Sequence, residues 1–428
     1  MRPVQLTPAL RLAVWAGAVI LFELALFAFA LAQLTAPVRG GDGPEYLRLA
    51  SNLVHHGVFS DSLRAPFDPS VLRSPGYPAL LAALRAVGLG SLGAIRVVQL
   101  VLLGLTAWVT GVITLRIAGE RAGRIAAVAT AAYLPLVWAT TEQMTETAAA
   151  LGLAVVALLL LSAREPRTWA LAGLALAATA YVRPTFLALA VPAAILIALQ
   201  TRRLVPAAVF AAAVAVAIAP WAIRTSIDAH TPVALQIGSG AGRYASAEQN
   251  LGRLPIPLEG TGWVAFKRVS RRTSNDLRRG RYTPVEQAEF DARMKRLAPH
   301  VPIRDVIDRL PARVRALWGP VDATPAAQRW TTSARMAGTL EYWLLAALVC
   351  VCLALRRRSL LSLWPLWLPA VYLTLVHMVI HVESRYSLPA RPELIVLAAV
   401  CVVSVHARRE HRQPDRAARV GGAQAAHT

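Results

Sequence analysis

The chain has 428 residues, of which 56% are hydrophobic and only 16% are charged, and lysine and arginine exceed aspartate and glutamate by 45 to 24. This apolar share is above the roughly 45–50% of an average soluble protein, so the composition excludes a disordered basic protein and disfavours a single soluble domain. The mean hydropathy of +0.48 points the same way. A polytopic membrane protein is expected, and the formal net charge of +21 has to be explained within it.

Ten apolar segments predict membrane-spanning helices, because a span needs about 20 mainly apolar residues and fewer when it is packed. In chain order they are residues 12–34, 94–115, 125–139, 148–162, 169–182, 186–199, 204–223, 338–355, 361–380 and 394–406. Three cysteines, Cys350, Cys352 and Cys401, lie inside apolar runs. They are therefore interpreted as core residues and not as a disulfide or zinc framework.

Arginines on alternate connections predict the orientation of these spans. They lie at 116–124, 164–167, 202–203, 356–358 and 408–412, and the positive-inside rule places these segments and both termini in the cytoplasm. The extracytoplasmic connections are then 36–93, 140–147, the turn at 183–184, 224–337 and 381–393. The expected domains are an N-terminal transmembrane module (1–223), an extracytoplasmic loop domain (224–337), C-terminal transmembrane helices (338–407) and a disordered cytoplasmic tail (408–428).

Helix signals occur inside the two large outer segments. The apolar stripe of residues 44–54 predicts a helix along the membrane surface that ends near Gly57. A second short helix is expected after Pro78, and a third begins at Thr283 with a capping box that ends on Glu286. An amphipathic pattern continues over 306–317, where Pro311 is expected to bend or break the helix. No strand pattern is long enough to predict a sheet.

Acidic residues are scarce, so those expected at the outer membrane edge are informative. Asp42 and Glu45 precede the helix at 44–54, and a capping box or a catalytic carboxylate explains them equally well. Glu142 and Glu146 are four residues apart and are expected to share a helix face. They either stabilise a helix N-terminus through its dipole or act in a functional site, and the functional interpretation is favoured because carboxylates at a membrane edge are costly.

Outer arginines are the second candidate feature. Arg183, Arg224 and Arg385 lie where the positive-inside rule does not call for arginine, and a guanidinium there can bind a phosphate bidentately. Snorkelling toward lipid headgroups is the alternative, equally good for Arg224. His377 and His381, with Glu383 behind them, are interpreted as a packed pair and not as a metal site. No Walker or dinucleotide-binding motif is present, which disfavours a nucleotide-driven enzyme.

These motifs together resemble a known family. They are Asp42-x-x-Glu45-Tyr46, Arg73-Ser74-Pro75-Gly76-Tyr77-Pro78, Thr145-Glu146, Arg183-Pro184, Pro220-Trp221-x-x-Arg224 and Arg385-Tyr386-x-x-Pro389. In this order and topological placement the chain resembles bacterial GT-C fold glycosyltransferases, the group related to protein O-mannosyltransferases and lipid A aminoarabinose transferases, and especially the Rgt-like lipopolysaccharide-core enzymes. The implied fold is an all-α polytopic membrane protein with about ten spans, surface helices and a large helical outer loop.

The resemblance also implies an activity at the bacterial plasma membrane. Such enzymes move a hexosyl or pentosyl group from a polyprenyl-phosphate donor to an extracytoplasmic glycan, lipid or protein acceptor, with inversion. The implied roles are base for Asp42, acceptor or base support for Glu146, and phosphate stabilisation for Arg385 and Arg183. Arg224 and Tyr386 are further candidates for phosphate binding. Site support is expected from Glu45, Tyr46, Arg73, Tyr77 and Glu142.

The remaining expectations concern cofactors, partners and alternatives. No cofactor is required, no metal ligands are assigned, and a divalent cation stays an open alternative. Membrane lipids are expected partners and nucleic acid is not, because much of the positive charge lies on the orienting loops and on an arginine cluster at 268–281 that would attract an anionic glycan or headgroups. The alternative function is a non-catalytic transporter or flippase of a lipid-linked anion, although paired repeats are lacking. An inactive homologue is a third alternative.

Overall fold

The computed structural model describes residues 42–257, 283–319, 331–355 and 360–403, and the isolated positions Leu21, Leu24, Ala25, Ala28 and Ala32. Within these ranges every regular element is a helix, in agreement with the expected all-α class. Apart from those isolated positions, the predicted first span lies outside the described residues. The arginine clusters at 268–281 and 356–358 and the predicted tail 408–428 also lie outside them.

Six described helices are long and apolar enough to cross a membrane. Two of the predicted spans, α7 (Glu146–Ser162) and α8 (Pro166–Val182), are not among these six. They have 17 residues each, or about 26 Å, which is slightly shorter than the roughly 30 Å hydrocarbon layer. The six spans are α4 (Leu92–Ala118), Pro184–Thr201 (η1, Pro184–Leu189, with α9, Ala190–Thr201), α10 (Leu204–Ala229), α15 (Thr332–Leu355), Leu361–Val379 (mainly α16, Trp364–Val379, after η5, Leu360–Leu363) and Ser384–Val403, which begins with η6 (Ser384–Ala390).

The predicted span 125–139 is not one straight helix. It is divided at Tyr133 into α5 (Glu120–Ala132) and α6 (Leu134–Thr141), which meet at 45°. Pro135 explains the break, because its ring has no N–H to continue the helix and clashes with the preceding turn. The amide of Leu134, released from the helix, donates to the carboxylate of Glu341 in α15 at 2.8 Å. The carboxylate of Glu341 therefore accepts the hydrogen bond of a backbone amide at the break between the two helices.

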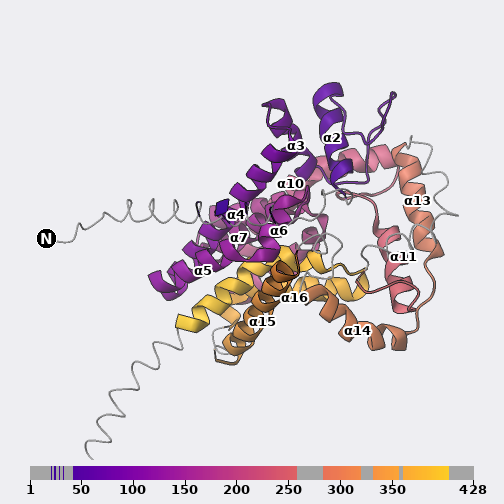
Figure 1. Ribbon diagram of the computed structural model, residues 1–428. Helices are drawn as coiled ribbons and strands as arrows, with labels where there is room; N and C mark the ends of the chain where they lie inside the picture. The colour runs from indigo at the N-terminus through magenta and orange to yellow at the C-terminus, as the bar shows by residue number, and fades with distance from the viewer. Residues whose placement is uncertain are drawn as a thin grey trace, which may run out of the picture.

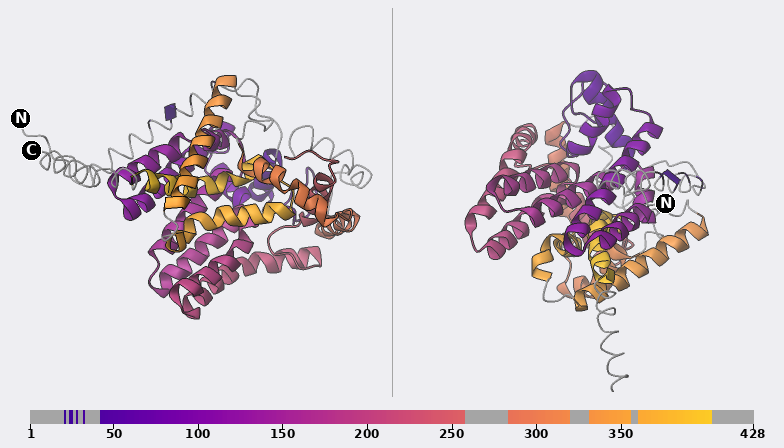
Figure 2. Two further views of the ribbon diagram at one scale, coloured as in Figure 1. Left: turned by 90° about the horizontal axis from the view of Figure 1, so that it is seen from below. Right: turned by 90° about the vertical axis from the view of Figure 1, so that its left-hand side faces the viewer.

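The spans pack side by side, as Figure 1 shows for α4, α5 and α7. Helix α4 packs on α5 and α7, α8 on α7 and α10, and α9 on α10. Small residues allow close approach: a Cβ at Gly173 in α8 would lie 2.4 Å from the carbonyl oxygen of Phe210 in α10. The two further views in Figure 2 show the same bundle from below and from its left-hand side.

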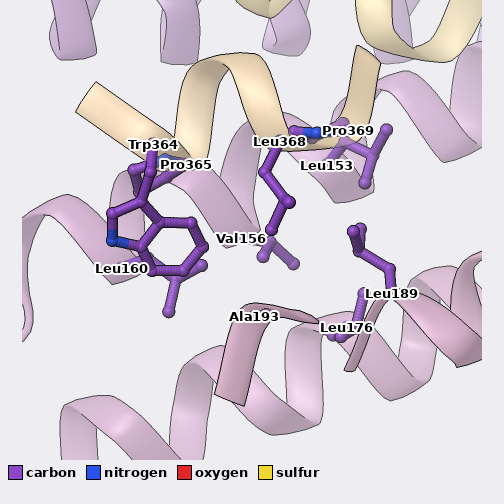
Figure 3. Close-up of a pocket in the computed structure, with 10 residues that line it drawn as sticks. All are labelled: Leu153, Val156, Leu160, Leu176, Leu189, Ala193, Trp364, Pro365, Leu368 and Pro369. Atoms are coloured by element: carbon purple, nitrogen blue, oxygen red, sulfur yellow. The ribbon is translucent and has the colours of Figure 1, made fainter. Parts of the chain in front are cut away.

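An apolar pocket lies within this bundle, between α7, α8, α9 and α16 (Figure 3). Its lining contains no ionisable side chain, so it offers no group for acid–base chemistry. The lining residues are Leu153, Val156, Leu160, Leu176, Leu189, Ala193, Trp364, Pro365, Leu368 and Pro369.

The two large connections predicted to be extracytoplasmic, called the outer segments below, form helices of their own. They are α2 (Gly43–His56), α3 (Gly76–Ala86), α11 (Ser239–Asn250), α13 (Pro284–Leu297) and α14 (Ile303–Trp318), of which α11, α13 and α14 gather at one end of the bundle in Figure 1. The predicted capping box of Thr283 and Glu286 is present, and α2 ends before Gly57 as expected. Helix α14 runs on through Pro311, so of the expected bend or break the break is wrong.

Helix α2 differs from the predicted membrane-surface helix in what its apolar face contacts. Tyr46, Leu49 and Ala50 are buried, and the face packs against Tyr77 and Leu81 of α3. A helix amphipathic enough to lie on a membrane can bury the same stripe against another helix, and its sequence does not distinguish the two.

The connections predicted to share one side of the membrane meet at one end of the bundle. Val71 donates its N–H to Gln287 Oε1 at 2.9 Å, and the amide of Ile237 donates to the carbonyl of Val71 at the same distance. The amide of Ser74 donates to Gln236 Oε1 at 3.1 Å. The first outer segment is thus hydrogen-bonded to the second, and the first also reaches Arg385 through Asp42.

Candidate functional site

Carboxylates and arginines from five separate segments of the chain converge at this end of the bundle. We call the group the arginine–carboxylate cluster; its members are Asp42, Glu45, Arg73, Glu146, Arg183, Glu383 and Arg385. With all seven side chains ionised, four carboxylates face three guanidinium groups. The cluster therefore carries one excess negative charge before any substrate binds.

Arg73 holds the start of α2. Its Nη2 atom lies 2.8 Å from Asp42 Oδ1 and 2.7 Å from Glu45 Oε2. The capping-box interpretation is wrong here, because Asp42 makes no side-chain hydrogen bond to the helix N-terminus. Its backbone carbonyl instead accepts from the amides of Glu45 and Tyr46, each at 3.1 Å. Both carboxylates are turned to Arg73.

Glu146 begins α7 and is 1% exposed. Arg183, in the connection between α8 and η1, donates through Nη1 to Glu146 Oε1 at 3.0 Å and to Thr145 Oγ1 at 3.4 Å. The other oxygen, Glu146 Oε2, is buried and has no hydrogen-bond partner in the described part of the chain. Glu142 follows the end of α6 in an extended conformation, so the expected shared helix face with Glu146 is wrong.

Arg385 joins the two halves of the cluster. Its Nε donates to Glu383 Oε2 at 2.6 Å, and its Nη2 donates to Asp42 Oδ2 at 3.2 Å. Its Nη1 lies 3.5 Å from Glu146 Oε1 and 2.8 Å from Met144 Sδ. One guanidinium is thus shared by three carboxylates that the chain supplies at positions 42, 146 and 383.

The environment of Asp42 keeps it ionised. Burial disfavours its charged form, but the guanidinium groups of Arg73 and Arg385 outweigh burial and hold the pKa of Asp42 well below its usual range. Burial lowers the pKa of Arg73, but the carboxylates of Asp42 and Glu45 outweigh burial and raise that pKa above its ordinary value. The Asp42 side chain is 30% exposed, so it is the carboxylate of the pair Asp42 and Glu146 that an outside molecule can reach.

A histidine–tyrosine pair supports Glu383. The hydroxyl of Tyr386 donates to Glu383 Oε1 at 2.9 Å and lies 2.8 Å from His381 Nε2. The guanidinium of Arg183 lies over the Tyr386 ring at 5.0 Å. Burial lowers the pKa of His381 despite the nearby Glu383. Tyr386 therefore contacts the cluster through Glu383 and through its ring.

Two further predicted tyrosines lie beside the cluster. Tyr46 and Tyr77 pack edge to face at 5.2 Å, and Arg73 lies over the Tyr46 ring at 5.3 Å. The Tyr77 hydroxyl donates to Gln99 Oε1 at 3.1 Å. Burial raises the pKa of Tyr46 to about 12, so at neutral pH its hydroxyl is a neutral hydrogen-bond donor and not a base.

Arg224 is a predicted site residue that lies outside the cluster and has contacts of its own. Its Nε pairs with Asp228 at 2.8 Å, and its Nη1 donates to the carbonyl of Ser70 at 2.9 Å. Its guanidinium also lies 4.8 Å from the centre of the Trp221 ring. These contacts join α10 to the first outer segment, and none of them involves a carboxylate of the cluster.

Within the described ranges no three His, Cys, Asp or Glu side chains are grouped so that they could hold a metal ion. The carboxylates at 42, 45, 146 and 383 each face an arginine. His377 donates through Nδ1 to the carbonyl of His381, 3.0 Å away, and its ring packs on Tyr386. This agrees with a packed histidine.

Two residues of this region are outside the predicted set of site residues. Glu383 anchors Arg385, and the only sequence signal for it is its place two residues before that arginine. Arg313 lies in α14, buried beside the end of α16. One arginine among many in an arginine-rich loop gives no sequence signal of burial.

Comparisons with known proteins identify the fold. No family model matches the chain, and no curated protein matches it. Among solved structures, the oligosaccharyltransferase AglB from Archaeoglobus fulgidus, in complex with an inhibitory peptide and a dolichol-phosphate, matches over 94% of this chain with a TM-score of 0.54 and 13% identity. The apo form of the same enzyme matches with a TM-score of 0.53 and 14% identity, again over 94% of this chain.

This chain has the GT-C fold. It spans about half of the archaeal enzyme, 52% of that chain. ArnT from Cupriavidus metallidurans bound to undecaprenyl phosphate matches less closely, with a TM-score of 0.44 and 16% identity over 90% of this chain and 78% of that one. The GT-C fold agrees with the fold expected from the motifs.

Proposed function

We propose that this protein is a membrane glycosyltransferase that moves a sugar from a polyprenyl-phosphate donor to an acceptor hydroxyl on the outer face of the bacterial plasma membrane. One observation carries the proposal: carboxylates and arginines converge at one end of a GT-C bundle, where a lipid-linked phosphate and a polar acceptor can meet. The dolichol-phosphate bound to the archaeal neighbour supports a lipid-linked donor. The acceptor class is an envelope glycan, a lipid or a protein.

The proposed reaction is a single displacement with inversion at the anomeric carbon. Asp42 takes the proton of the acceptor hydroxyl, whose oxygen forms a bond to that carbon. The bond from the carbon to the phosphate oxygen breaks, and its electron pair leaves with the polyprenyl phosphate. Arg385 and Arg183 stabilise the negative charge that develops on the departing phosphate. The proton on Asp42 is released to solvent afterwards.

The resting ion pairs suggest when Asp42 becomes a base. Both of its oxygens are bound by guanidinium groups, at 2.8 Å to Arg73 and at 3.2 Å to Arg385, and a carboxylate with a lowered pKa accepts protons poorly. A donor phosphate competes with the carboxylates for Arg385. When the donor binds, the ion pair between Arg385 and Asp42 weakens, and the pKa of Asp42 rises toward its ordinary value. Asp42 is therefore an effective base only when the donor is bound.

Glu146 has a separate role in this scheme. It is 1% exposed, so an acceptor approaching from outside meets Asp42 first. Its unpartnered Oε2 can accept a hydrogen bond from a hydroxyl of the bound sugar or acceptor, which would satisfy a buried oxygen that is costly to leave unpaired. We assign Glu146 to holding a substrate hydroxyl and Tyr386 to supporting Glu383.

The proposal is tested with purified protein in proteoliposomes that contain polyprenyl-phosphate sugars and candidate acceptors. We expect transfer of labelled sugar and a product whose anomeric configuration is opposite to that of the donor. Movement of the lipid between leaflets without any transfer would favour a flippase and overturn the proposal. A product that retains the donor configuration would contradict the single displacement. Loss of one envelope glycan structure in a deletion strain would identify the sugar and the acceptor.

A further inference from the structure

Arg313 is a fully buried arginine outside the cluster. It is 0% exposed, and no carboxylate of the described residues lies within ion-pair distance of it. A buried cation without a counter-ion is costly unless every donor is satisfied. The cost is visible in the pKa of Arg313, which burial lowers to about 10.

All five N–H donors of Arg313 are used, each with a different acceptor. Nε donates to Asn250 Oδ1 at 2.9 Å. Nη1 donates to the carbonyls of His377 at 3.0 Å and Ile380 at 2.8 Å. Nη2 donates to the carbonyl of Ser246 at 3.1 Å and to its Oγ at 2.9 Å. A guanidinium presents five donors in a fixed fork, and neither lysine nor a neutral side chain can replace that pattern.

These acceptors join three elements. Ser246 and Asn250 belong to α11, and Arg313 itself belongs to α14. The carbonyls of His377 and Ile380 lie at the C-terminal end of α16, where unpaired carbonyls and the helix dipole attract a cation. Arg313 therefore caps a membrane-spanning helix from within the outer helices.

Helix α11 also bonds directly to the same stretch of chain. Ser246 Oγ donates to the carbonyl of Val379 at 2.7 Å, and the amide of Val382 donates to Gln249 Oε1 at 3.3 Å. The residue after Val382 is Glu383, which binds Arg385. The connection from α16 to η6 is thus fixed by the outer helices immediately before the residues of the cluster.

We propose that Arg313 is a positioning residue that fixes the connection between α16 and η6, and with it the Glu383–Arg385 pair, so that the outer helices α11 and α14 and the phosphate-binding arginine move as one unit. This inference rests on the proposed function, because it assigns Arg313 to the geometry of phosphate binding. An apolar residue could fill the same space without the desolvation cost. An apolar residue would lose all five directional bonds. Two of them hold carbonyls of the stretch that leads to Arg385, and three hold α11.

The test measures binding of undecaprenyl phosphate, without sugar or acceptor, to purified full-length variants in detergent. Arg313→Met keeps the bulk of the side chain and removes every donor, and we expect about tenfold weaker binding. Arg313→Lys keeps the charge and should restore part of the affinity. The matched control is Arg315→Gln, which changes an exposed arginine on the same helix and should bind as the wild type does. In transfer assays the KM for the donor should rise more than kcat falls.

A milder variant keeps the proposal testable if Arg313→Met does not fold. Ser246→Ala leaves Arg313 in place but removes its bond to Ser246 Oγ and the bond from that hydroxyl to Val379, and we expect roughly twofold to threefold weaker phosphate binding. Folded variants that bind undecaprenyl phosphate as tightly as the wild type would overturn the positioning role. If the wild type itself does not bind undecaprenyl phosphate, the proposed function fails, and the inference fails with it.

Discussion

At the scale of single residues, the ion pairs of Asp42 determine both its charge and its reactivity. Arg73 and Arg385 hold it from two sides, which keeps the carboxylate charged and makes it a weak base at rest. Asp42 can therefore contribute to stability and to catalysis under different conditions. Its contribution to stability needs both guanidinium groups bound to it. Its action as a base needs at least one of them to bind another anion, such as the donor phosphate. Stability and activity should respond differently to changes at this position.

The stability contribution of Asp42 has a defined dependence on pH. Because its folded-state pKa is lowered below the unfolded value of about 3.9, the contribution is fully present above about pH 5 and is lost as pH falls toward the folded-state pKa. We expect the difference in Tm between the wild type and Asp42→Asn to be constant from about pH 5 to 8 and to shrink below about pH 4. At neutral pH the loss should be about 1 kcal/mol, since the pairs are partly exposed. A difference that changes through pH 6 to 7 would contradict this account.

Glu383 should affect the donor more than the chemical step. Glu383→Gln keeps the size of the side chain but removes the charge that binds Arg385 Nε at 2.6 Å. We expect the KM for the lipid donor to rise about threefold to tenfold, with a smaller change in kcat. Glu248→Gln is the control, because Glu248 is also buried and also pairs with an arginine, Arg253, outside the cluster. A fall in kcat at unchanged KM would contradict a positioning role for Glu383.

At the scale of elements, close contacts between helices place the arginines. Gly76 begins α3 inside the motif Arg73-Ser74-Pro75-Gly76-Tyr77-Pro78 and lies against the end of α8. A Cβ there would lie 2.6 Å from the backbone of Tyr181 and Val182, next to Arg183. The glycine of the motif therefore lets α3 approach α8 closely enough for Arg73 and Arg183 to belong to one cluster.

This contact predicts the effect of one added methyl group. Gly76→Ala should force α3 away from α8, lower stability by about 1 to 3 kcal/mol and reduce transfer, which thermal unfolding and the transfer assay would measure. Gly93→Ala is the matched control in the first turn of α4, where nothing lies within 4 Å of the added Cβ. Equal behaviour of the two variants would show that the close approach of α3 and α8 is not required.

At the scale of the whole molecule, composition and charge were sufficient to predict much of the fold. The long apolar runs predict most of the spans, and the alternating arginines predict which connections lie together; those that carry Asp42, Glu146, Arg183 and Arg385 do meet at one end. Whether that end faces the outside is a separate prediction, because the contacts between connections are the same in either orientation.

Other features depend on contacts between distant parts of the chain, which sequence patterns do not encode. The break at Tyr133 involves a partner in α15, Glu341, more than 200 residues away. Arg224 resembles Arg183 in its sequence setting, yet it pairs with Asp228 and not with the cluster. Glu142 is close to Glu146 in sequence, but it lies before α7 in an extended conformation and so does not share a helix face with Glu146.

The orientation can be measured by cysteine labelling in a variant that lacks the three native cysteines. We expect Leu63→Cys, in the exposed first outer segment, to react with a membrane-impermeant thiol reagent in intact spheroplasts. Arg203→Cys, in the exposed connection between α9 and α10, should react only after permeabilisation. The reverse pattern would place the cluster in the cytoplasm and exclude an extracytoplasmic acceptor.

The most direct test of the central claim compares two aspartates in the transfer assay. Asp42 and Asp228 are similarly exposed, 30% and 26%, and each lies 2.8 Å from an arginine, but only Asp42 belongs to the cluster. We expect Asp42→Asn to reduce transfer at least about 100-fold at unchanged expression, as removal of a general base does, and Asp228→Asn to transfer at a rate close to that of the wild type. Undiminished transfer by Asp42→Asn would contradict the account.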